Sequence, residues 1–165
     1  MKLRKYEARD SNIICSWIKD EKALYQWSAN RIGKFPLKGY ELNEAYSKAG
    51  EIVPFVAVDD DNENTIMGNI LIRYPNEEDR KTVRFCFVIV SPSLRGQGYG
   101  KKMVQLAIEY ARKKLQVSRI TLGVFLNNPK ARHCYESIGF KPCGEISMFK
   151  KNGIAWECTE MEITF

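Results

Sequence analysis

Residues 90–101 read VSPSLRGQGYGK, and they join an apolar segment to an amphipathic one through three alternating glycines. Glycines let the backbone approach a ligand closely, and the first N–H groups of a helix point outward together at the positive end of the helix dipole. We therefore expect this turn to bind an anion such as a pyrophosphate. A plain glycine-rich turn is the alternative. The dinucleotide motif GxGxxG and the ATP-binding motif GxxxxGKS/T are both unmatched here, so neither NAD nor ATP is indicated.

The segments on either side of this turn predict a buried strand and a long helix. Residues 82–90 (TVRFCFVIV) are apolar at nearly every position of their second half, which is typical of a strand buried on both faces. Residues 99–114 repeat apolar side chains at helical spacing, namely Met103, Leu106, Ala107, Tyr110 and Ala111. The turn therefore leads from a central strand into a helix.

The remaining chain alternates between strand and helix patterns. Strand patterns cover residues 2–7, 52–58, 65–74, 119–125, 140–149 and 154–165, and helical patterns follow Asp10-Ser11 and cover 21–29, 36–48 and 129–138. This order predicts an α/β (mixed α+β) fold, a mixed sheet with helices against it. We expect one domain over residues 1–165, because the length and the 44% hydrophobic content suit a single compact core.

Composition excludes several functional classes. No apolar run approaches the ~18 residues that span a membrane, and the first residues lack the apolar stretch of a signal peptide, so we expect a cytoplasmic protein with no membrane partner. The net charge of +6 is dispersed, which argues against nucleic acid and would suit a polyanionic cofactor.

The five cysteines predict neither disulfides nor a metal site. They are scattered and contain no CxxC pair, which suits a reducing compartment. The single histidine, His133, is adjacent to Cys134, and helix geometry would point these two side chains apart. We therefore expect no metal and no Cys–His nucleophile.

Two motifs resemble a known family. Residues 95–100 (RGQGYG) fit the Q/R-x-x-G-x-G/A signature of the GNAT N-acetyltransferases. Residues 128–140 (NPKARHCYESIGF) look like the N-x-x-A-x-x-x-Y-x-x-x-G-F element of the same family, in the expected order and separation. The resemblance covers roughly residues 52–149. It implies a twisted, mostly antiparallel sheet of about seven strands, splayed in the middle and flanked by helices on both faces, with acetyl-coenzyme A as cosubstrate.

The resemblance also implies the cofactor-binding residues. The central strand and its parallel neighbour would separate after Val88, and the backbone of residues 88–90 would hydrogen-bond the pantetheine arm. The amides of residues 96–101 would hold the pyrophosphate. From the residues alone, Asn128 before Pro129 is an ordinary helix N-cap, and the family adds a cofactor contact. The expected cofactor-binding set is Val88, Ile89, Val90, Arg95, Gly96, Gln97, Gly98, Tyr99, Gly100, Lys101 and Asn128.

Tyr135 stands at the tyrosine of the second motif, which implies that it is the general acid for the departing thiolate. Reference pKa values of ~10 for tyrosine and ~8.5 for a thiol make full proton transfer uphill, so its hydroxyl would act mainly by stabilising charge. The alternative is a core tyrosine, since it shares a helical stripe with Ala131, Cys134 and Ile138.

The general base is not evident in the sequence. Many relatives carry a carboxylate on the central strand or on the strand that follows it. Here the central strand has Arg84 and Cys86 instead. The following strand has Gly123 where a branch that acetylates peptide N-termini carries a glutamate. A lysine-like amine with a pKa of ~10.4 must lose a proton before it attacks. Burial of the amine, a water chain, Glu145 or Glu157 could serve.

The expected activity is direct acetyl transfer, in a ternary complex, to a primary amine. The departure at Gly123 favours a small-molecule acceptor over a protein terminus. A protein N-terminal or lysine acetyltransferase and a non-catalytic acyl-coenzyme A sensor are the alternatives, and a homodimer is allowed. Aromatic residues in the helical opening region would either wall the acceptor site or pack in the core, namely Trp17, Trp27, Tyr40 and Tyr46.

Overall fold

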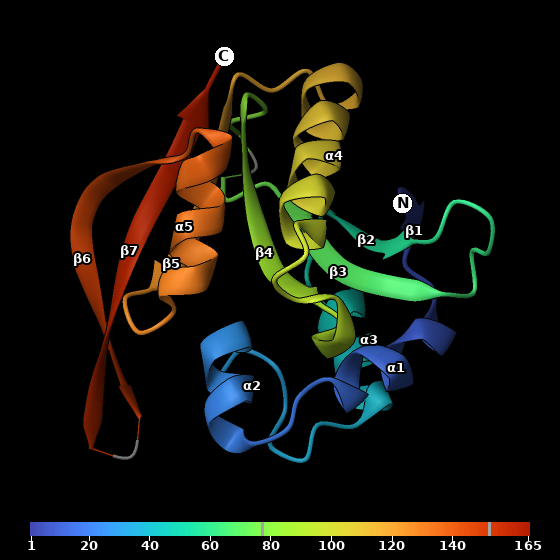
Figure 1. Cartoon of the computed structure of the whole chain (residues 1–165). Helices are drawn as coiled ribbons and strands as arrows, with labels where there is room; N and C mark the ends of the chain where they lie inside the picture. The colour runs from blue at the N-terminus through green and yellow to red at the C-terminus, as the bar shows by residue number, and fades with distance from the viewer. Residues whose placement is uncertain (77, 152) are drawn as a thin grey trace.

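Seven strands form a single sheet in the computed structural model, which describes residues 1–76, 78–151 and 153–165 (Figure 1). In spatial order the strands are β1 (Lys2–Lys5), β2 (Ile52–Val58), β3 (Ile66–Arg73), β4 (Thr82–Val90), β5 (Arg119–Phe125), β7 (Ile154–Thr164) and β6 (Lys141–Lys151). Neighbouring strands are antiparallel except β4 and β5, which are parallel. The expected mixed, mostly antiparallel sheet is confirmed.

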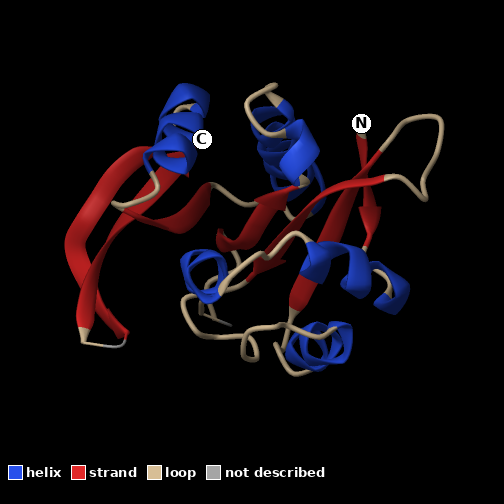
Figure 2. Cartoon of the chain, turned by 60° about the horizontal axis from the view of Figure 1, so that its bottom comes forward, coloured by secondary structure: helices blue, strands red, loops and turns tan. Residues whose placement is uncertain are grey.

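Helices cover both faces of this sheet (Figure 2). They are α1 (Ser11–Ser16), α2 (Glu21–Ser28), α3 (Gly39–Ser47), α4 (Tyr99–Lys114) and α5 (Pro129–Ile138), with short 3-10 segments η1 (Ala8–Asp10) and η2 (Pro92–Leu94). Helices α4 and α5 lie on one face and α1 to α3 on the other (Figure 2). The predicted helices and strands are therefore present, within a few residues at their ends.

Each face of the sheet has its own apolar core. On the first face, Met103 and Ala107 of α4 are fully buried against Ile70, Val83 and Ile120 of the strands. On the second face, the fully buried side chains come from helices and strands alike, namely Ile14, Leu42, Val56 and Leu71. Burial of apolar area on both faces stabilises the central strands. In β4 the buried apolar side chains are Val83 and Phe85, whereas residues 86–90, whose apolar run predicts burial on both faces, are only half-buried.

One helix begins later than the sequence pattern indicates. The pattern starts at Pro36, but α3 begins at Gly39 because Lys38 is extended, with φ −101° and ψ 148°. The Lys38 N–H donates to Glu41 Oε2 at 2.8 Å, and this bond fixes the start of the helix.

Strands β4 and β5 pair over only three positions. Their partners are Thr82 with Arg119, Val83 with Ile120 and Arg84 with Thr121. Beyond these pairs the strands separate, and we call the gap between residues 85–90 of β4 and 122–125 of β5 the fork. The expectation that the strands separate only after Val88 is wrong by four residues.

A β-bulge in β4 accompanies the fork. The β3–β4 register shifts from Asn69 opposite Ile89 to Leu71 opposite Cys86, so two residues of β4 stand opposite one of β3. Phe87 in the bulge has φ +51°, which is uncommon for a residue other than glycine. The fully buried Asn69 donates from Nδ2 to the Phe87 carbonyl at 2.8 Å and to the Tyr46 hydroxyl at 2.8 Å. Asn69 therefore holds the bulge from the neighbouring strand.

Replacing Asn69 with leucine should lower the free energy of unfolding by about 1–3 kcal/mol, because a buried carbonyl and a buried hydroxyl lose their partner. Urea denaturation measures this change. Tyr46→Phe is the matched control: it leaves the bond to Phe87 in place and should cost less. An Asn69→Leu variant as stable as the wild type would show that this amide does not hold the bulge.

Candidate active site

The turn before α4 leaves its backbone amides open. Gly96 and Gly98 have φ +77° and +82°, and a Cβ on either would meet no atom within 4 Å. Gly98 is the N-cap of α4 and has no side chain with which to cap it. The first N–H groups of a helix have no partner within the helix, so those of α4 point into the open space in front of the glycines. This cradle of amides fits a phosphate group.

The longer side chains of the turn bond within the protein. Gln97 Nε2 donates to the Ser93 carbonyl at 2.8 Å, and Lys101 Nζ donates to the Ser137 carbonyl at 3.1 Å, in the last turn of α5. Arg95 Nε donates to the Val90 carbonyl at 3.2 Å. Anion binding at this turn would therefore depend mainly on backbone amides.

The end of β4 presents backbone groups to the fork. Ser91 donates its N–H to the Met67 carbonyl of the β3 side at 2.9 Å. Because hydrogen-bonding groups alternate along a strand, those of Val90 point the other way, towards the fork. Val88 and Ile89 border the same gap. An extended chain with amide groups could bond here as an added strand would.

Asn128 caps α5, as its position before Pro129 predicts. Its side chain accepts a hydrogen bond from the Ala131 N–H at 3.3 Å. The neighbouring Asn127 accepts a bond from Gln26 Nε2 of α2 at 3.0 Å, so α2 is tied to the loop that follows β5. The geometry shows the capping role of Asn128 and leaves a cofactor contact as a proposal.

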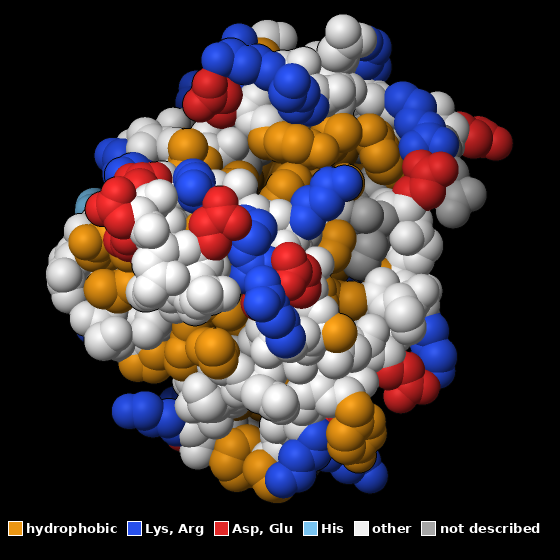
Figure 3. Space-filling view, turned by 90° about the vertical axis from the view of Figure 1, so that its right-hand side faces the viewer, with side chains coloured by type: hydrophobic (Ala, Val, Ile, Leu, Met, Phe, Trp, Pro, Cys, Tyr) orange, Lys and Arg blue, Asp and Glu red, His pale blue; other side chains and the backbone are white. Residues whose placement is uncertain are grey.

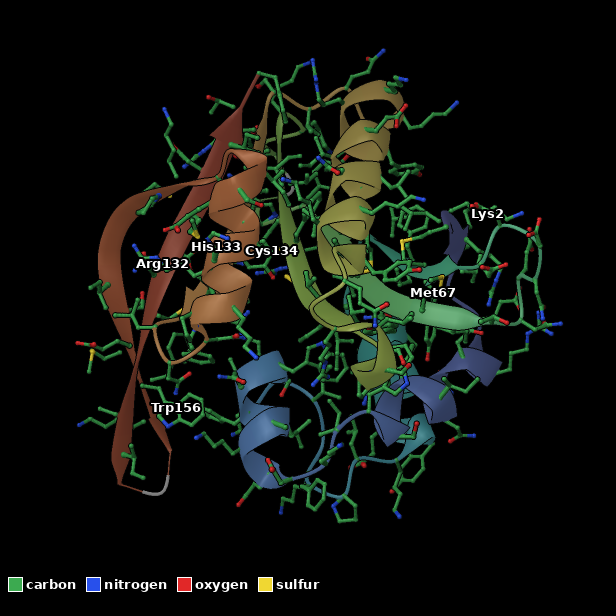
Figure 4. The ribbon with its side chains drawn as sticks, viewed as in Figure 1. Lys2, Met67, Arg132, His133, Cys134 and Trp156 are labelled. Carbon is green, nitrogen blue, oxygen red and sulfur yellow. The ribbon has the colours of Figure 1, made fainter. Side chains whose placement is uncertain are left out.

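Helix α2 lies across the end of the fork and contacts both of its limbs (Figure 1). On the β4 side, the Trp27 ring lies 5.7 Å from that of Phe87, centroid to centroid. On the other side, the Tyr25 ring lies 5.7 Å from Phe125 of β5 and 4.9 Å from Trp156 of β7, which Figure 4 labels beside α2. Trp17 and Tyr46 are buried in the core, and Tyr40 is 69% exposed.

Tyr135 is buried on α5. Its ring contacts Phe140 edge to face with centroids 6.0 Å apart, as expected for a core tyrosine. Burial raises the pKa of the Tyr135 phenol above its ordinary value, and the Cys134 and Cys86 thiols add to the effect. Tyr135 belongs to the same buried core as Phe85 of β4 and Leu122 of β5, which stand on the two limbs of the fork, so the side chain packs near the fork. A phenol that stays protonated can donate a hydrogen bond to a developing anion.

His133 and Cys134 diverge, as their adjacent positions predict. His133 is exposed, whereas the Cys134 sulfur lies 4.0 Å from the position of a Cβ on Gly100 of α4. Figure 4 labels both side chains on α5. Among the residues that the structure describes, no group of three or more His, Cys, Asp or Glu side chains could hold a metal ion.

A carboxylate at the base of the fork is one that sequence analysis missed. Glu160 of β7 forms a bidentate ion pair with Arg84 of β4. Glu157, a candidate base, is exposed, and its odd spacing from Glu160 points its side chain to the opposite face of β7. The side chain of Glu145, the other candidate, lies outside the described residues. Only the register of β7 against β5 brings Glu160 here, and no local pattern reveals that register.

The surface charge and the helices concern two other kinds of partner, nucleic acids and membranes. On the face shown in Figure 3, lysine and arginine side chains are interspersed with aspartate and glutamate. Within the described ranges, no helix has both the length and the apolar character needed to cross a bilayer.

The open amides at the start of α4 suit the diphosphate of a coenzyme A thioester, and the unpaired edge of β4 beside them suits its amide-containing arm. The chain is a coenzyme A-dependent acyltransferase. It belongs to the Acetyltransferase (GNAT) family, whose model matches residues 16–140. The activity of this family makes it an acetyl-coenzyme A-dependent N-acetyltransferase.

Curated relatives and solved structures carry related names. The chain is 22% identical over 143 residues to an N-acetyltransferase 9-like protein of Nematostella vectensis, covering 82% of this chain and 71% of that protein. It is 34% identical over 59 residues to a spermidine N(1)-acetyltransferase of Vibrio cholerae, covering 36% of this chain and 34% of the relative. A solved chimera of the Vibrio cholerae spermidine N-acetyltransferase SpeG and hSSAT has 27% identity and a TM-score of 0.78, covering 99% and 96% of the two chains.

A second solved structure shares the fold at lower identity. The spermidine N-acetyltransferase from Vibrio cholerae in complex with CoA and spermine superposes with a TM-score of 0.80 at 24% identity, covering 99% of this chain and 94% of that one. It supports the fold alone.

Changing Gly98 to valine should abolish most of the thermal stabilisation that acetyl-coenzyme A gives, because the side chain would enter the space in front of the amide cradle. The left-handed backbone itself costs a β-branched residue about 1–2 kcal/mol. Gly50→Val is the matched control, since Gly50 also has positive φ (+67°) and open space around it but lies between α3 and β2. Differential scanning fluorimetry compares both variants with and without the cofactor. Normal cofactor stabilisation of Gly98→Val would remove this turn from the phosphate site.

Proposed function

We propose that this protein transfers the acetyl group of acetyl-coenzyme A to the primary amine of a small molecule by direct attack in a ternary complex. The observation that carries the proposal is the fork, which opens beside the amide cradle of α4. The names of the spermidine N-acetyltransferases among the relatives support a small amine as acceptor. Gly123, in place of a glutamate, agrees with such an acceptor.

In this proposal, the backbone supplies most of the cofactor site. The amides of residues 96–101 hold the pyrophosphate, and the fork edge of residues 88–90 bonds the pantetheine arm. Asn128 contacts the cofactor while it caps α5. Acetyl-coenzyme A supplies the activated acetyl group as a thioester. The protein orients this group and the amine towards each other.

Tyr135 acts on the departing sulfur. Because burial raises the pKa of its phenol, the hydroxyl keeps its proton at neutral pH and stabilises the thiolate as a hydrogen-bond donor. Such a bond gains strength in a site that excludes water.

Direct transfer needs no enzyme nucleophile. Burial raises the pKa of the Cys134 and Cys158 thiols. It also raises the pKa of Cys15 to about 11. Mostly protonated thiols are poor nucleophiles, so these cysteines are ill suited to form an acetyl-enzyme.

Acetyl-coenzyme A should raise the melting temperature far more than NADH or ATP at equal concentration, since a ligand stabilises the folded state that binds it. Differential scanning fluorimetry tests this, and coenzyme A release across a library of primary amines then identifies the acceptor. Equal shifts with all three ligands would refute the cofactor assignment.

Tyr135→Phe removes only the hydroxyl and should lower the rate of acetyl transfer by ~10²-fold or more, as expected for a lost general acid, with cofactor affinity and stability little changed. Tyr110→Phe is the control, because Tyr110 of α4 instead packs against Phe55, with ring centroids 4.7 Å apart. Pre-steady-state transfer measures the chemical step apart from product release. An unchanged transfer rate would leave Tyr135 as a core residue.

A further inference from the structure

An ion pair crosses the base of the fork. Arg84 Nη1 lies 2.5 Å from Glu160 Oε2, and Arg84 Nη2 lies 2.9 Å from Glu160 Oε1. The two side chains are 19% and 30% exposed, so solvent reaches the pair. Burial alone would lower the pKa of the guanidinium, but the carboxylate outweighs it and raises that pKa. The bidentate contact holds the Glu160 carboxylate in one geometry.

Gly123 makes room for this pair. It stands directly opposite Glu160 in the β5–β7 register and is exposed. A Cβ there would lie 2.8 Å from Arg84 Nη2 and 3.1 Å from Glu160 Oε1. Gly123 stands where the branch that acetylates peptide N-termini carries a glutamate on β5, and its lack of a side chain admits a carboxylate from β7 instead.

The pair lies on the face of the sheet that an acceptor would approach. Val83 and Phe85 point into the core under α4, and so does Met161 of β7. Because side chains alternate along strands, Arg84 and Glu160 point to the opposite face. The amide cradle belongs to α4, so a cofactor bound there leaves this opposite face to the acceptor. Arg84 stands opposite Thr121 at the last β4–β5 pair, and Tyr135 belongs to the same buried core as Phe85, the next residue of β4, so the ion pair and Tyr135 lie near the same part of β4.

We propose that Glu160, oriented by Arg84, binds the amine of the acceptor. The inference rests on the proposed function, since it requires an amine acceptor in the fork. A carboxylate has about four lone-pair positions, and the bidentate bond to Arg84 uses two, so Glu160 can still accept hydrogen bonds from an ammonium group.

The charges on this face also define the class of acceptor. Among the described side chains, Glu160 pairs with Arg84 and Glu162 pairs with Arg119. This pairing leaves Glu160 and Glu162 no uncompensated charge with which to attract a second ammonium group, so we expect a monoamine to be acetylated at least as well as a polyamine.

The test measures acetyl transfer to a set of primary amines that pairs polyamines with monoamines of similar length, including spermidine with hexylamine. Glu160→Gln should lower kcat/KM for the best acceptor by about 10- to 100-fold, the range expected for a lost hydrogen bond between charged groups. The loss should lie mainly in the acceptor KM, with the KM for acetyl-coenzyme A unchanged. Glu162→Gln is the control, because Glu162 lies on the same strand and face and also pairs with an arginine, but stands opposite Thr121, before the fork opens.

Glu160→Asp keeps the negative charge and should restore part of the acceptor KM that Glu160→Gln loses. If the ion pair were purely structural, the substitutions would not affect the acceptor KM alone. An unchanged acceptor kcat/KM in Glu160→Gln, or an equal loss for acetyl-coenzyme A, overturns the role of Glu160 and leaves the proposed function standing. A higher kcat/KM for spermidine than for hexylamine overturns the expectation that a monoamine is acetylated at least as well as a polyamine. Failure of the wild type to acetylate any amine overturns the proposed function itself.

Discussion

The buried hydrogen bond from Asn69 to the Phe87 carbonyl is the constraint from which the site follows. It stabilises a bulge in the middle of β4, and a bulged strand bends and twists away from a straight neighbour. Parallel pairing with β5 ends after three positions. The separation frees backbone groups along β4 that an unbroken sheet would consume. The apolar side chains of β4 pack in the core, and its unpaired backbone groups form a polar edge that can bind a ligand.

Much of this fold is readable from the sequence because local patterns fix its elements. The helix of residues 99–114 and the strand of residues 82–90 are long and strongly periodic, and both appear with those bounds. The glycines at 96 and 98 do take the left-handed conformations that a tight approach to a ligand needs. These features depend on neighbours in the chain, which the sequence shows directly.

Other features depend on residues distant in the chain, and the sequence does not show them. The bulge at Phe87 needs Asn69, from another strand, and nothing in residues 82–90 marks it. Glu160 reaches Arg84 only because β7 pairs with β5 in one register, and a shift of one residue would turn its side chain to the other face. Glu157 lies three residues from Glu160 on the same strand, so its side chain points to the opposite face, but the sequence alone does not show which of the two faces the fork.

Helix α2 turns the fork into a closed frame. The two limbs are joined at one end by the three β4–β5 pairs, and at the other end α2 packs Trp27 on Phe87 and bonds Gln26 to Asn127. A frame joined at both ends has a set width before any ligand arrives. Because the two limbs need little further ordering when a ligand binds, less conformational entropy is lost and more of the contact energy appears as binding affinity. The same closure makes α2 the element that a larger group entering the fork from this end would have to displace.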